Sequence, residues 1–150
     1  MVSIVCIGVC FFLFPTTHLF FFDAKIAREL PIHGNLQHKI LNIPDSEKDE
    51  VIDVFTKVKI PWIPRDASKI SSRDAAREYK LYVNLVFGEQ MFVNLFIYED
   101  NSMEAYLYPW NRPWGMHTEY VVKNPEVLQE VVEIAVECGR IQGILPNENT

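Results

Sequence analysis

The pair of residues best suited to acid–base chemistry is His117 and Glu119, two positions apart in the segment Met116 to Val122. Residues i and i+2 of a β-strand share a face, so an imidazole and a carboxylate would stand side by side there. Val121 joins them on the more polar face of the strand, and such a face usually meets water, where neither group acquires a pKa suited to catalysis. We therefore expect no catalytic centre. The alternative is a small hydrolase-type enzyme that uses His117 and Glu119.

Other residues capable of chemistry lack a supporting pattern. His33 and His38 are five positions apart, which does not align them on a helix, and the chain contains no Cys-x-x-Cys or His-Glu-x-x-His pattern for a metal. Ser68, Ser71 and Ser72 have no Gly-x-Ser-x-Gly sequence around them. The sequence also contains no Gly-rich phosphate loop. It therefore predicts no catalytic residues, no metal and no cofactor.

The loop Pro109 to Gly115 (PWNRPWG) has a composition typical of binding sites. Its two tryptophans and one arginine are residue types enriched at binding hot spots, and proline lowers the entropy lost on docking. We predict a binding site made of Trp110, Arg112 and Trp114, with Trp62 from the Ile60 to Pro64 segment joining it. The alternative is that both indoles fold over the edge of the core, with Arg112 stacked on one of them.

The charge balance restricts the partner. The chain has 20 acidic and 14 basic residues, which gives a net charge of −6. All of these charged residues lie after residue 22. Nucleic-acid binding requires clustered Lys and Arg, so a nucleic-acid partner is not expected. A protein, a peptide or a cell-wall component fits better. The acidic stripe expected on the last helix, with Glu126/Glu130 and Glu133/Glu137 pairs, either faces a basic partner or is an ordinary solvated surface.

The first 22 residues are apolar and uncharged. Val2 to Phe22 is about as long as a helix that spans a bilayer, and its break at Pro15 to His18 also fits a signal-peptide core. No Lys or Arg precedes the core and the small-x-small cleavage pattern is missing. We expect residues 1–22 to be a membrane anchor or a signal peptide, which implies a membrane-anchored or secreted protein of the cell envelope. A buried core helix and a misassigned translation start are the alternatives.

Residues 23–34 are expected to be a linker because Pro31 and Gly34 interrupt a helix. A single domain then covers residues 35–145, and residues 146–150 form a polar tail. The domain begins with a strand at Leu36 to Ile43, followed by a helix at Glu47 to Lys59 that is capped by Asp45 or Ser46.

The centre of the chain gives the clearest β pattern. Alternation and short polar turns predict an antiparallel meander of strands at Tyr79 to Phe87, Met91 to Tyr98, Met103 to Tyr108 and Met116 to Val122. A final helix follows, with Asn124 as N-cap, Pro125 at its first position and Gly139 just past its end. The fold class is therefore α+β: an antiparallel sheet of four to five strands, two main helices packed on it, and an apolar N-terminal helix before it.

This order of elements resembles a group of small uncharacterised exported or lipoprotein domains of Gram-positive bacteria. The resemblance covers Leu36 to Val136. It rests on the strand Lys39 to Ile43 (KILNI), the helix that starts DSEKDEVI at Asp45, and the hairpin Phe92 to Tyr108 with its IYEDN turn. It implies one helix before an antiparallel sheet and carries over no catalytic residues. The chain departs from the lipoprotein members in having Val9 before Cys10 and no basic start.

Overall fold

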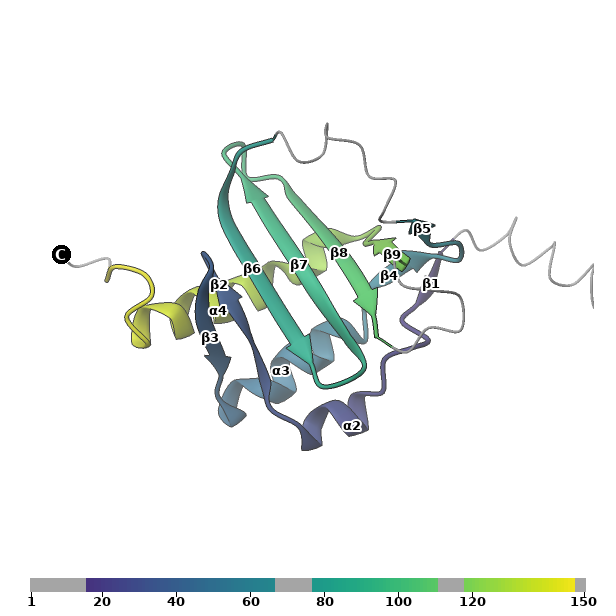
Figure 1. Cartoon of the computed structure of the whole chain (residues 1–150), viewed down its shortest axis with the longest axis horizontal. Coiled ribbons are helices and arrows are strands. Elements are labelled where there is room, and N and C mark those ends of the chain that lie inside the picture. Colours follow the sequence, from purple (N-terminus) through teal and green to yellow (C-terminus); the bar gives the residue numbers. More distant parts are fainter. Residues whose placement is uncertain (1–15, 67–76, 111–117, 148–150) are drawn as a thin grey trace, which may run out of the picture.

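Seven antiparallel strands form the main sheet, in the spatial order β3-β2-β6-β7-β8-β9-β5 (Figure 1). The computed structural model describes residues 16–66, 77–110 and 118–147. In chain order the elements are β1 (Thr16–His18), α2 (Ala24–Glu29), β2 (Ile32–Leu36), β3 (Lys39–Ile43), α3 (Asp45–Phe55), β4 (Lys59–Pro61), β5 (Arg65–Asp66), β6 (Tyr79–Phe87), β7 (Met91–Tyr98), β8 (Met103–Pro109), β9 (Thr118–Val121), the 3₁₀ turn η3 (Pro125–Leu128) and α4 (Gln129–Ile141). The α+β class and the antiparallel sheet are thus as predicted.

The core lies between the sheet and helices α3 and α4, which lie behind the same face of it, and α2 packs beside α3 (Figure 1). Alternation decides which side chains enter the core, since successive residues of a strand point to opposite faces. Val83, Leu85 and Phe87 of β6 are buried, as are Val93 and Leu95 of β7. From the helices, the largest fully buried side chains are those of Phe55, Ile52 and Leu128.

The predicted count of four to five strands is wrong, and the hairpin before α3 is one cause. The single strand expected at Leu36 to Ile43 is the end of β2, a two-residue turn and β3. Gln37 and His38 in the turn both have positive φ, 48° and 63°. Such turns normally contain Asn-Gly or a similar pair, so Gln-His gives no turn signal in the sequence.

The N-terminal region also differs from the expectation. Residues 1–15 lie outside the described part of the chain, but Thr16–His18 pairs with β4 as β1 rather than continuing an apolar helix. Leu19 is buried, and the Phe22 ring contacts Phe55 and Phe87 in the core. The predicted linker is wrong too: residues 24–29 are helix α2, capped by the Asp23 carboxylate, and β2 follows. Within residues 16–66, 77–110 and 118–147, no helix is long and apolar enough to cross a membrane.

The two long helices occupy their predicted regions with different ends. Helix α3 starts at Asp45 behind Pro44, without a side-chain cap, and stops at Phe55 because residues 59–61 form β4. Gly139 lies inside α4 rather than past its end. Its missing side chain leaves room for Leu36, whose Cδ2 would lie 2.2 Å from an added Cβ. Gly143, with φ +72°, comes directly after the C-cap residue Gln142.

Four side-chain carboxamides pair with backbone groups in the manner of a neighbouring strand. Asn124 is the N-cap residue of η3 as predicted, but its side chain makes no capping bond; it accepts from the Lys59 N–H and donates to the Lys57 carbonyl. Gln37 bonds the Lys80 carbonyl and the Tyr82 N–H, which extends the β2–β6 pairing by one step. The remaining two pairs are Gln90 with both backbone groups of Asp23 and Gln142 with both backbone groups of Asn42.

Candidate binding face

The face of the sheet that points away from the helices, called the open face here, is lined by polar and aromatic side chains, most of them half-buried and a few, such as Asn84, buried. At its centre Asn35 of β2 is paired in register with Asn84 of β6, which is paired with Asn94 of β7. Directly paired residues on one face have neighbouring side chains. These three carboxamides, called the amide row here, therefore lie side by side across three strands.

Aromatic rings stand on both sides of the amide row. The first aromatic cluster comprises His38, Tyr79, Tyr82 and Phe96, with the His38 ring stacked on Tyr82 at 5.0 Å and Phe96 at 5.2 Å from Tyr82. Tyr106, whose ring contacts Phe96, is paired in register with Asn94 and continues the row onto β8. The second comprises Phe92, Tyr108 and Trp110, with Phe92 stacked on Tyr108 at 4.6 Å. On β6, the residues on the two sides of the row are Tyr82 and Val86. They are four residues apart, which is about 13 Å along the strand.

A chain of polar contacts crosses this face from β6 to β5. The Asn84 amide donates to Asn94 Oδ1 at 2.8 Å. The Tyr108 hydroxyl donates to Glu119 Oε2 at 2.5 Å, and the Arg65 guanidinium pairs with the other carboxylate oxygen. Desolvation, followed by the hydrogen bond to Glu119, raises the pKa of Tyr108, while a hydrogen bond with Asn94 acts in the opposite direction. Tyr108 is therefore held as a neutral donor to a carboxylate.

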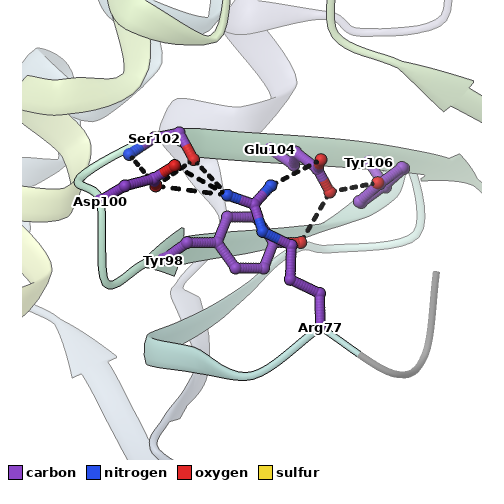
Figure 2. A network of polar contacts seen from close by, with 6 residues as sticks. All are labelled: Arg77, Tyr98, Asp100, Ser102, Glu104 and Tyr106. Atoms are coloured by element: carbon purple, nitrogen blue, oxygen red, sulfur yellow. Dashed lines mark hydrogen bonds and ion pairs between the residues drawn. The ribbon is translucent and has the colours of Figure 1, made fainter.

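A second polar network closes the end of the open face at the β7–β8 turn (Figure 2). The Arg77 guanidinium lies 3.5 Å from the Tyr98 ring centroid, between the Asp100 carboxylate at 3.1 Å and the Glu104 carboxylate at 3.5 Å. The hydroxyls of Tyr98 and Tyr106 both donate to Glu104 Oε2, at 2.6 and 2.7 Å.

The Glu104 carboxylate is stabilised in its ionised form. Desolvation alone would raise its pKa, but the hydrogen bonds from Tyr98 and Tyr106 and the charges of Arg77 and Arg65 outweigh it, so the pKa is lowered. A carboxyl group with a lowered pKa is a poor general acid near neutral pH. Glu104 therefore serves to hold the tyrosines and arginines in place.

The structure describes some of the residues predicted to form a site and not others. Glu119 is 1% exposed, so the expectation that it stands on a solvated strand face is wrong; β5 pairs along β9 and brings Arg65 over it. Trp110 is 54% exposed and its ring meets Phe92 edge-on at 5.6 Å. Trp62 is exposed between β4 and β5. Three of the predicted residues, Arg112, Trp114 and His117, lie outside the described residues.

Sequence reasoning missed the amide row and the two aromatic clusters. The signal was present, since the outward positions of the central strands alternate with apolar ones and include Asn84, Asn94 and Phe92. The meander places Asn84 beside Asn94, but the full row could not be recognised because no local signal shows that β2 pairs with β6. Asn35 in particular enters the row through the pairing of β2 with β6, whose partners are about fifty positions apart in the chain.

Two further observations concern cofactors and relatives. Among the residues that the structure describes, no three His, Cys, Asp or Glu side chains are grouped so as to hold a metal ion. No protein-family model matches the chain, and no curated protein or solved structure is significantly similar to it.

Proposed function

We propose that this protein is a non-catalytic binding module of the cell envelope that binds its ligand on the open face. The observation that carries the proposal is the amide row between two aromatic clusters, on a sheet face that no described helix covers. Half-exposed aromatic rings supply large contact areas at low entropy cost, and carboxamides supply directional hydrogen bonds. The envelope location is part of the proposal and rests on the uncharged residues 1–15 alone, because residues 16–22 pack in the domain.

The polar networks favour binding over catalysis. In both networks the carboxylate accepts hydrogen bonds from tyrosine and pairs with arginine, as in the Arg65–Glu119–Tyr108 arrangement. Each carboxylate is thus tied to tyrosine and arginine side chains of the protein itself, which is the arrangement expected of an orienting group. These networks are suited to fixing the orientation of the outward rings.

Site-specific photo-cross-linking tests the proposal. A photoreactive phenylalanine analogue replaces Phe96, within the open face, or Ile141, which is exposed on α4 behind the sheet and is the control. The full-length protein is irradiated with the membrane and wall fraction of its source cells. We expect a defined adduct from position 96 and none from position 141. Equal labelling at the two positions, or none at 96, would contradict the proposal.

A further inference from the structure

Building on the proposed function, we infer that the ligand of the open face is a neutral glycan. The polar groups at the centre of the face are uncharged and partly unused. Asn35 is half-buried and its carboxamide forms no hydrogen bond within the described part of the chain. Asn84 is 9% exposed; its amide nitrogen donates to Asn94 and to the Val93 carbonyl, while its side-chain oxygen accepts nothing from the described residues.

An unused acceptor on a side chain this buried points to a ligand. A buried polar group without a partner costs free energy, and native proteins satisfy nearly all such groups. The Asn84 oxygen and the Asn35 carboxamide together offer two acceptors and a donor on neighbouring strands. A row of this kind matches the hydroxyl and acetamido groups of a sugar, each of which donates and accepts.

The aromatic clusters extend the match over more than one sugar unit. Sugar rings have apolar faces that stack on aromatic side chains, and the second cluster offers Trp110, which is more than half exposed. Rings lie on both sides of the amide row, about 13 Å apart along the strands. An oligosaccharide laid along the strands would contact both clusters while its hydroxyl groups meet the amide row between them.

Charge on the open face argues against an ionic ligand. Arg65 is paired with Glu119, and Arg77 with Asp100 and Glu104, so the arginines beside the aromatic clusters are compensated within the protein. The chain as a whole is acidic, which disfavours anionic polymers. A neutral ligand loses little in desolvation on such a surface.

The edges of the sheet argue against an extended peptide. Peptides that join a sheet pair with the backbone of an exposed edge strand. At one edge, Gln142 occupies the outward backbone groups of Asn42 in β3. The other edge strand, β5, is only two residues long. Recognition therefore falls to the face of the sheet, where side chains rather than backbone groups make the contacts.

Calorimetric titration of the full-length chain tests the inference, in a detergent whose headgroup is not a sugar. The probes are a tetramer of N-acetylglucosamine, a tetramer of glucose and a neutral tetra-alanine peptide. We expect at least one sugar to bind with a dissociation constant below about 1 mM. Asn35→Ala should weaken it about fivefold and Trp110→Ala about tenfold, while Ile141→Ala leaves it unchanged.

The inference is overturned if neither sugar binds, or if the peptide binds more tightly than both. Sugar binding that is insensitive to both Asn35→Ala and Trp110→Ala would also overturn it, because the site would lie elsewhere. Asn35→Ala removes no hydrogen bond within the described residues, so folding should be preserved, and circular dichroism of the variant checks this. A cross-link at position 96 combined with no sugar binding rejects the glycan alone. Failure of both experiments rejects the binding module.

Discussion

The carboxamide of Gln142 binds both backbone groups of Asn42, one hundred positions away: the Asn42 N–H donates to Oε1 at 3.1 Å, and Nε2 donates to the Asn42 carbonyl at 2.7 Å. In an antiparallel hairpin such as β2–β3, successive pairs of opposite residues alternate. The backbone N–H and C=O groups of one pair bond across the hairpin, and those of the next pair point away from the partner strand. Leu36 and Lys39 close the two-residue turn, which leaves the backbone groups of Ile40 and Asn42 pointing outward. One side chain therefore covers half of the outward backbone positions of this edge strand.

Gln142→Ala should uncover the edge of the sheet. Backbone hydrogen exchange at Asn42 should accelerate, and the free energy of unfolding should fall by about 1 kcal/mol for the lost hydrogen bonds. Self-association should rise in sedimentation measurements, because an exposed strand edge pairs with another copy. Gln129→Ala, which removes only a contact with Glu133 on the surface of α4, is the matched control. Unchanged exchange at Asn42 would show that the carboxamide does not protect the strand.

Truncation at two points should separate the dispensable N-terminal residues from those that belong to the domain. Deletion of residues 1–15 should leave the domain folded. Deletion of residues 1–22 removes β1 and the Phe22 contacts with Phe55 and Phe87, so it should lower the melting temperature strongly. Phe22 is partly buried, so the loss of its contacts should cost less than the ~3–5 kcal/mol of a fully buried aromatic, and the loss of β1 and of buried Leu19 adds to it. Equal melting temperatures for the two deletions would refute the role of residues 16–22 in the core.

Glu104 should make stability depend on pH. Its pKa in the folded protein is lowered below the ordinary value of 4.5, so its contribution is present above that value and is lost as pH falls through the folded pKa. In Glu104→Gln, the loss of stability between pH 7 and pH 3 should be smaller than in the wild type. Urea unfolding at both pH values measures this difference. Glu89→Gln, at an exposed position in the β6–β7 turn, is the matched control for the removal of one carboxylate.

Gly139→Ala should destabilise the protein although alanine favours helix. The new methyl group would lie 2.2 Å from Cδ2 of Leu36, which is fully buried, and overpacking of this kind costs about 1–3 kcal/mol. In Gly143→Ala the added methyl group would meet no other atom within 4 Å. Because Gly143 has a positive φ, only a conformational cost of about 1 kcal/mol is expected. Thermal unfolding ranks the two variants. If Leu36→Val rescues Gly139→Ala, the contact itself is the cause.

The sequence predicted the elements that depend on local pattern. The strands at Tyr79, Met91 and Met103 begin where alternation placed them, and the last helical region begins at Pro125 as expected. The failures come from long-range contacts. Glu119 was expected in water because no local signal shows that the two-residue strand β5 covers it. Gln37 and His38 adopt positive φ because the Gln37 carboxamide and the His38 ring both bind β6.

In the candidate site, too, the features that depend on local sequence could be predicted and those that depend on long-range pairing could not. Exposure of an indole in the loop after β8 could be predicted from its prolines, and Trp110 is indeed exposed. The amide row could not be predicted, because three asparagines on three strands become neighbours only when the pairing of β2 with β6 is known.

The position of β6 between β2 and β7 has a consequence for the kinetics of folding. Strands β6, β7 and β8 are joined by short turns, so their pairing closes only small loops. The β2–β6 pairing joins Gly34 to Leu85 and closes a loop several times longer, at a greater cost in entropy. We therefore expect the three-stranded meander to form early and the β2–β3 hairpin to dock afterwards, so that substitutions in β7 slow folding while substitutions in β3 mainly speed unfolding.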